Sequence, residues 1–413
     1  MRSVLRNTVA QSSISIGTLT FAAALVLQGA CKNSSDGNGK GPSDAGKDMG
    51  HDAAADAGDA AASDGGDAAV AGLGFTPSNF DPSDLDLTGL GDVDITDSNC
   101  YINSEMEDSR CFDPSSVTFK VITQPNQIKV GIYAARSWRI EPNAILKVMG
   151  SFPLILVATD KIDILGGLVA AAAGDVAVAG GYTQTQWATD GSGPGGGGAG
   201  SATSAAGGAS YCGIGGSGGA MGGTAAAGGT AYGTPEIIPL VAGSQGGGGL
   251  QTNGGAGGGA IELVAGSAVS ILSGAYVNVG GGHGNWSGGG GGSGGSILIE
   301  APMVTVTGKL AANGGGGQGG PGGTAATDAS ATDKPATGST SYDAGAAGGN
   351  GSAGAMPDGS DGADGSDTVV AGGGGGGAGR IRINTSSGSA KLTGGTLSPA
   401  AATICLTQGT LKP

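Results

Sequence analysis

The sequence predicts an all-β protein whose folded part is a right-handed parallel β-solenoid (β-helix) with glycine-rich insertions on one edge. Three observations lead to this prediction. Short runs alternate apolar and polar residues, the runs recur in units of about 20 residues, and glycine-rich segments separate the units. No sustained helical periodicity follows Val117.

The composition by itself would indicate disorder, because 92 of the 413 residues are glycine and the net charge is −15. The apolar residues are clustered, however. Leu, Ile, Val and Phe are frequent between 115 and 172 and absent between 314 and 368. The acidic balance and the lack of a basic stripe exclude nucleic acid as an expected partner.

Residues 1–30 are predicted to be a signal peptide, because two arginines precede an apolar stretch at 14–27 that ends in small residues. The run before Cys31 resembles a bacterial lipoprotein signal, although Gln28 stands where that signal usually carries an apolar residue. The resemblance implies that Cys31 is lipidated and anchors the chain to a membrane. Ordinary signal cleavage beside an incidental cysteine is the alternative.

Residues 31–71 are predicted to be a disordered acidic tether. Between 32 and 69 the segment consists mainly of Asp, Gly, Ala and Ser, without Leu, Ile, Val or Phe, so no core can form. Its like charges favour an extended chain that lifts the folded part off the membrane. Residues 72–114, with short acidic–hydrophobic runs at 85–87 and 93–95, are interpreted as an N-terminal cap.

The chain contains five cysteines, and setting aside Cys31 leaves an even number in an oxidising compartment. Cys100 and Cys111 close a short, mostly polar loop, and we expect them to form a disulfide. Cys212 and Cys405 would then pair and tie a glycine-rich insertion to the C-terminal strand. Free thiols and other connectivities stay open at this stage.

Residues 115–413 are predicted to form the solenoid. Half-buried strands are expected at 117–121 and 128–130. Each following unit has three short strands, which cannot bury an apolar face alone but can when stacked. The four units begin at Leu154, Ile261, Ile297 and Ile381.

The glycine-rich insertions fall at one place in the repeat, after the third strand of a unit, at 180–234, 280–295 and 314–368. We therefore expect them to form a crest on a single side of the solenoid. They are expected to be ordered near the solenoid and mobile at their tips. The alternative fold is a sandwich of stacked polyglycine-II-like strands.

Paired carboxylates are the first candidate for chemistry. Aligning the first strands of the units places Ile155, Glu262, Leu298 and Arg382 in one outward column, with Glu300 two residues further along. Glu262 and Glu300 are the plausible pair for glycoside cleavage, as in parallel β-helix enzymes that act on polysaccharides. Solvated charges of the outer face explain them more simply, so no catalytic residue is predicted.

The remaining motifs predict no metal site and no cofactor. The G-x-G-x-x-G match at 213–218 lacks the helix that a dinucleotide site requires. Aspartates at every third position from Asp358 to Asp367 suit a solvated flexible loop better than a calcium site. Trp138 is expected in the cap or core, and Trp187 and Trp286 are expected to anchor loops rather than to stack on sugars.

The cassettes GGGAIELVAG, GGSILIEAP and GGGGAGRIRINT resemble the glycine-rich, PE-PGRS-like surface proteins of bacteria, over about 145–397, without the helical PE domain of that family. The resemblance implies display at the cell envelope. We expect a non-enzymatic, surface-exposed outer-membrane lipoprotein with a structural or adhesive role, whose partners are the membrane and extracellular polysaccharide or other surface proteins. The alternative is a carbohydrate-binding or polysaccharide-cleaving β-helix protein.

Overall fold

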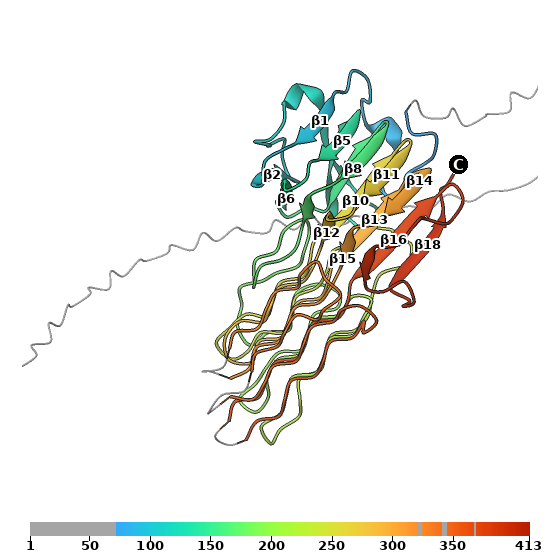
Figure 1. Ribbon diagram of the computed structural model, residues 1–413. Helices are drawn as coiled ribbons and strands as arrows, with labels where there is room; N and C mark the ends of the chain where they lie inside the picture. The colour runs from blue at the N-terminus through green and yellow to red at the C-terminus, as the bar shows by residue number, and fades with distance from the viewer. Residues whose placement is uncertain (1–71, 321–323, 341–344, 367–368) are drawn as a thin grey trace, which may run out of the picture. The chain divides into compact units, whose positions relative to one another are not determined.

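The computed structural model describes residues 72–320, 324–340, 345–366 and 369–413 (Figure 1). The predicted signal peptide, the lipidation site Cys31 and the acidic tether lie outside these residues. Within the described ranges the protein is all-β, with eighteen strands. The helices found there are two single 3-10 turns, η1 (Pro82–Asp84) and η2 (Pro114–Ser116).

The strands form three sheets, and every pairing between named strands is parallel except that of β3 with β4. The seven-stranded sheet has the order β18 (Leu406–Thr410), β16 (Arg380–Thr385), β13 (Ser296–Glu300), β10 (Ala260–Ala265), β7 (Leu154–Ala158), β4 (Lys129–Ala135) and β3 (Thr118–Thr123). The five-stranded sheet has the order β1 (Asp92–Ile95), β5 (Ser137–Ile140), β8 (Lys161–Ile164), β11 (Ala268–Ile271) and β14 (Met303–Val306). The six-stranded sheet has the order β17 (Thr396–Ser398), β15 (Lys309–Ala311), β12 (Tyr276–Asn278), β9 (Gly167–Val169), β6 (Ile145–Met149) and β2 (Cys100–Asn103).

Consecutive strands visit the three sheets in turn. Strands β7, β8 and β9 belong to the seven-, five- and six-stranded sheets, and β10 to β12 and β13 to β15 repeat the same order. The register aligns the residues with which the predicted units begin: Ile261 pairs with Leu154 and Ile297, and Ile297 with Ile381. The sequence repeat therefore corresponds to neighbouring strands in each sheet.

One core lies between the three sheets. In β11, Val269 and Ile271 are buried while the intervening residues are partly exposed, as the alternating sequence predicts. Side chains such as Leu263 and Leu310 join them in a single apolar cluster that draws on all three sheets. Burying one such side chain contributes roughly 1.5–3 kcal/mol, which compensates for the shortness of the strands.

The opposite face of the seven-stranded sheet is also buried, so that β7, β10 and β13 have no exposed position. Residues 73–85, which we call the cover segment, and residues 237–242 pack on this face in a second apolar cluster. Burial on both faces explains why β7 is apolar throughout instead of alternating. The region interpreted as an N-terminal cap thus contributes this cover and, through β1 and β2, edge strands of two sheets.

The glycine-rich insertions occupy residues 170–259, 279–295 and 312–379, and each connects the six-stranded sheet to the seven-stranded sheet. They share one position in the repeat, as the sequence predicts. Figure 1 shows their extended segments running beside one another, away from the strands.

Backbone hydrogen bonds join the insertions with a three-residue period. The amides of Gly213, Gly216 and Gly219 donate to the carbonyls of Ala378, Gly375 and Gly372. This spacing is typical of polyglycine II, which has three residues per turn. Polyglycine-II-like strands, which the sequence analysis gave as the alternative for the whole fold, therefore form the insertions. The apolar runs form β-sheets.

Candidate functional site

The two carboxylates singled out in the sequence lie on adjacent strands, in the expected register. Glu262 pairs with Ile155 and Leu298, and Glu300 pairs with Val264. The expectation that they are solvated is wrong, because their exposed fractions are 0% and 1%. The cover segment lies over them.

Both carboxyl groups bind the cover segment. Glu300 accepts hydrogen bonds from the Ser78 amide (2.8 Å) and hydroxyl (2.7 Å), and from Nδ2 of Asn384 (2.9 Å). Oε2 of Glu262 accepts one from Nδ2 of Asn79, at 2.9 Å. In the described residues no donor reaches Oε1 of Glu262. Glu300 therefore accepts three hydrogen bonds and Glu262 one, which is the pattern expected when Glu300 is ionised and Glu262 is neutral.

Burial raises the pKa of Glu262 well above its ordinary value, and the neighbouring charge of Glu300 raises this pKa further. A proton held on Glu262 avoids burying two like charges side by side. The pair is closed to solvent, and glycoside cleavage needs carboxyl groups that reach both substrate and water. We therefore interpret the pair as a polar clasp for the cover segment.

A groove of about 1150 Å³ lies beside this clasp, between the cover segment, the turn joining β3 to β4, and Ile238–Pro239. Its apolar wall includes Phe75, Phe80 and Ile122. The rim carboxylates are already engaged: Asp81 accepts hydrogen bonds from Ser83, and Asp84 lies 3.5 Å from Lys120 Nζ. The groove thus has apolar lining without converging catalytic groups.

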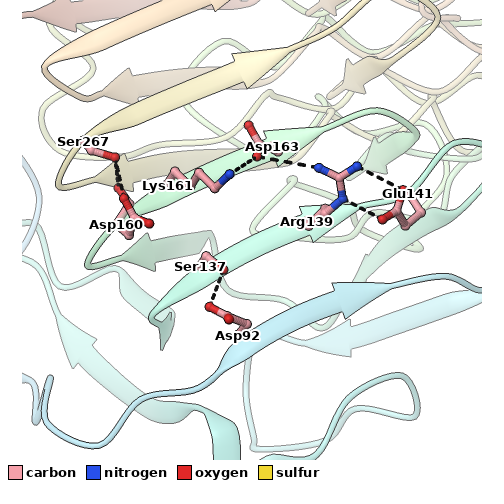
Figure 2. A network of polar contacts seen from close by, with 8 residues as sticks. All are labelled: Asp92, Ser137, Arg139, Glu141, Asp160, Lys161, Asp163 and Ser267. Carbon is pink, nitrogen blue, oxygen red and sulfur yellow. Dashed lines mark hydrogen bonds and ion pairs between the residues drawn. The ribbon is translucent and has the colours of Figure 1, made fainter.

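Figure 2 shows a polar network over β5 and β8 of the five-stranded sheet. Its members are Asp92, Ser137, Arg139, Glu141, Asp160, Lys161, Asp163 and Ser267. Oδ2 of Asp163 lies 3.0 Å from Lys161 Nζ and 3.8 Å from Arg139 Nη1, and Arg139 Nε lies 2.6 Å from Glu141 Oε1. The hydrogen bond to Glu141 raises the pKa of Arg139. Each cation of the network has a carboxylate partner, so positive and negative side chains alternate on this face. Each of these exposed ion pairs contributes little to the stability of the fold.

The tryptophans differ from one another in environment. Trp138 is 1% exposed and donates from Nε1 to the Val157 carbonyl at 2.9 Å, as expected of a core residue. Trp187 is 61% and Trp286 81% exposed, so the expectation that they anchor their loops by packing is wrong. Both stand in turns of the glycine-rich insertions.

Both predicted disulfides are present, Cys100–Cys111 and Cys212–Cys405. The second joins the first insertion to the segment before β18. Next to it, the rings of Tyr211 and Tyr232 stack at 4.4 Å, and the Arg380 guanidinium donates to the Tyr232 carbonyl at 2.9 Å. Burial raises the pKa of Tyr211 to about 12, which keeps this hydroxyl protonated. These contacts fix the insertion to the sheets.

Of the aspartates spaced by three residues, Asp361 and Asp364 are exposed to solvent as expected, and Asp367 lies outside the described residues. The expectation of a flexible loop is wrong, because this segment is bonded to another one at regular intervals. The aspartate Oδ1 atoms accept hydrogen bonds from amides that have the same spacing on another segment: Asp358 from Ile214, Asp361 from Ser217 and Asp364 from Ala220. One aspartate per turn therefore binds the neighbouring polyglycine segment. Among the residues that the structure describes, no group of three or more His, Cys, Asp or Glu could hold a metal ion.

Asp328 joins all three insertions, and one of its partners is His283, for which the sequence analysis predicted no role. Nδ1 of His283 lies 2.6 Å from Oδ1 of Asp328, which also accepts hydrogen bonds from the amides of His283 and Gly174. The hydrogen bond to Asp328 raises the pKa of His283. Burial would raise the pKa of Asp328, but its hydrogen bonds with His283 and Gly174 outweigh burial and lower it.

Comparison of the chain with protein-family models, with curated proteins and with solved structures gives no match. In the described part of the chain, no helix combines the length and the apolar character needed to cross a membrane.

Proposed function

We propose that the chain is a lipid-anchored, non-enzymatic surface protein whose folded part is a right-handed parallel β-solenoid. The solenoid is supported by the order in which consecutive strands visit the three sheets, and by the in-register pairing of Leu154, Ile261, Ile297 and Ile381. The right-handed sense follows from the strong preference of crossover connections between parallel strands for a right-handed path.

The close packing of the insertions carries the proposal of a structural or adhesive role. A Cβ atom at Gly208 would lie 2.0 Å from the Gly375 carbonyl oxygen, and one at Gly196 would lie 1.8 Å from that of Gly191. Backbones at this distance leave no space for side chains or substrate between them. The insertions therefore act as a rigid support whose exposed turns meet other surfaces.

Anchoring at Cys31 completes the proposal. Residues 31–71 would serve as the tether, and the cover segment that follows is held through Ser78 and Asn79 to the buried carboxyl pair. A lipid at Cys31 gives membrane attachment without a spanning helix. The PE-PGRS-like cassettes and the two disulfides agree with display outside the cytoplasm, at the outer membrane.

Metabolic labelling with palmitate tests the anchor. The full chain is expected to incorporate label, and Cys31→Ser is expected to abolish it and to release the protein from membranes. Cys212→Ser, which also removes one sulfur, serves as the control and should keep the label. External protease on intact cells should digest the wild type. Equal labelling of wild type and Cys31→Ser, or protection from protease, would contradict the proposal.

The competing function is polysaccharide cleavage by the carboxyl pair. Turnover of a polysaccharide by the purified protein that is lost in both Glu262→Gln and Glu300→Gln would overturn the non-enzymatic assignment. The burial of both groups is the reason we expect no such turnover.

A further inference from the structure

Several large apolar side chains of the glycine-rich insertions are exposed, and three of them lie in turns that are bonded to one another: Trp187 (61% exposed), Leu250 (51%) and Trp286 (81%). A single exposed apolar residue is ordinary on a protein surface, but two exposed tryptophans and a leucine on linked turns are not. The indole ring is the largest apolar side chain, and here two of them stay in water.

Hydrogen bonds hold these turns beside one another. The Ala188 amide donates to the Gly249 carbonyl at 2.9 Å, and the Asn285 amide donates to the Asn253 carbonyl at 3.2 Å. The turn at 248–253 therefore lies between the two tryptophan turns and is bonded to both. The positions from which the rings project are fixed by the polyglycine packing beneath them.

The two tryptophan turns share a residue pattern and one backbone feature. Each tryptophan follows an amide residue, Gln186 or Asn285, and precedes a small residue with positive φ, Ala188 (52°) or Ser287 (55°). Left-handed backbone is unfavourable in residues other than glycine, and such conformations concentrate at functional sites. Two insertions thus carry an amide residue and an indole ring before a residue with left-handed backbone.

The scarcity of basic residues in the segments that form these turns indicates which kind of ligand could bind there. No Lys or Arg occurs between Lys161 and Lys309, a stretch that includes all three turns. Anionic lipids and anionic polymers are attracted by clusters of basic residues, so neither fits this surface. A neutral sugar ring fits it, because its C–H face packs on an indole while its hydroxyls bond to neutral amides.

We propose that Trp187 and Trp286 form a binding platform for a neutral polysaccharide, with Gln186 and Asn285 bonding to its hydroxyls. The inference rests on the proposed display of the protein at the cell surface, and it names the class of molecule that the displayed protein would bind there. Fixed backbones at both rings reduce the entropy lost when an extended chain spans them. Binding at two rings also strengthens the attachment of a repeating polymer.

Co-sedimentation of the full mature chain with microcrystalline cellulose, chitin and an insoluble neutral β-glucan tests the platform. Binding to at least one is expected. Trp187→Ala and Trp286→Ala should each weaken it about tenfold, and the double variant should abolish it, whereas tyrosine at either position should retain part of it. Because Trp138 is buried, a shift of tryptophan emission on addition of a soluble oligosaccharide reports on the exposed pair.

Ile404→Ala is the matched control, because Ile404 is 80% exposed and lies outside the insertions. Its binding should equal that of the wild type, and all variants should keep the wild-type unfolding transition. Absence of binding to every neutral polysaccharide, undiminished binding by the double variant, or binding only to alginate or to anionic phospholipid vesicles would overturn the platform. Those results leave the palmitate labelling of Cys31 untouched, so failure of the platform and failure of surface anchoring are distinguished.

Discussion

Glu262 on β10 and Glu300 on β13 hold the same cover segment, the first through Asn79 and the second through Ser78. Their roles in the clasp are unequal. Glu300 accepts from three donors of the cover segment and of Asn384, while Glu262 has a strongly raised pKa and is the group that carries a proton. The inequality makes the two residues respond differently to the same substitution.

Glu262→Gln is expected to leave the protein as stable as the wild type at pH 5 and more stable at pH 8. The pKa of Glu262 is higher in the folded chain than its ordinary value of 4.5, so the folded state holds the extra proton. Wild-type stability therefore falls as pH rises above about 4.5 toward the folded-state pKa, and a neutral amide removes this loss. Urea unfolding at both pH values measures the difference.

Glu300→Gln is the matched comparison at the neighbouring position. The amide group of glutamine would replace one accepting oxygen by a donor, which would face the Ser78 amide at Oε2 or the Ser78 hydroxyl and Asn384 at Oε1, and this costs about 1–3 kcal/mol. Equal effects of the two substitutions, or a wild type that gains stability from pH 5 to pH 8 relative to Glu262→Gln, would refute the assignment of the proton.

Substitution of a glycine within the polyglycine packing should destabilise the fold according to the space at that position. A Cβ at Gly208 would lie 2.0 Å from the Gly375 carbonyl oxygen, so Gly208→Ala forces segments apart and costs about 1–3 kcal/mol or more. Gly200 is the control, because its Cβ would lie 3.1 Å from the nearest atom, the Ala206 nitrogen. Thermal unfolding of both variants tests this, and a larger loss at Gly200 would argue against the packing.

The two disulfides are expected to differ in their contribution to stability. Cys212 and Cys405 are 193 residues apart, and Cys100 and Cys111 are 11 apart. Chain-entropy arguments give about 5 kcal/mol for the long loop and about 3 kcal/mol for the short one. Removing the long pair by a double serine substitution should therefore lower the free energy of unfolding more. It should also expose the first insertion to limited proteolysis, and the opposite order of effects would contradict this expectation.

The register of the strands and the order in which they are connected could be predicted, because both depend on local sequence patterns. The alternation of apolar and polar residues predicted the strands, and the glycine content predicted where the insertions lie. The alignment of the repeat units predicted the pairing of Glu262 with Leu298. Counting cysteines predicted the short Cys100–Cys111 bridge and left Cys212 and Cys405 as the remaining pair. The signals for the strands and insertions lie within a few residues of the features that they predict.

Burial of the glutamates could not be predicted in the same way, because Ser78 lies 222 residues before Glu300 in the chain. The uninterrupted apolar run of β7 was a signal of burial on both faces, but it does not identify the covering segment. The period of the aspartates matched polyglycine II, yet the partner segment lies 144 residues away. Exposure of Trp187 and Trp286 depends on how the insertions stack, which no local pattern specifies.

The pairing of His283 with Asp328 predicts a pH-dependent contact among the insertions. Because the pKa of His283 is raised above 6.5, its stabilising contribution is present below about pH 6.5 and is lost as pH rises through the folded-state value. Because the pKa of Asp328 is lowered below 3.8, its contribution is present above that value and is lost at more acidic pH. The contact should therefore stabilise most between about pH 4 and 6.5.

Proton NMR of the imidazole group measures this directly. His51 is the other histidine of the chain, and His51→Gln leaves one imidazole signal. In that background the pKa of His283 should exceed 6.5. Asp328→Asn should bring it below 6.5, because an asparagine keeps an acceptor for the amides of Gly174 and His283 but removes the charge, and burial then dominates. An unchanged pKa in Asp328→Asn would show that the carboxylate does not hold the imidazolium, and the ion pair would then make no contribution to joining the insertions.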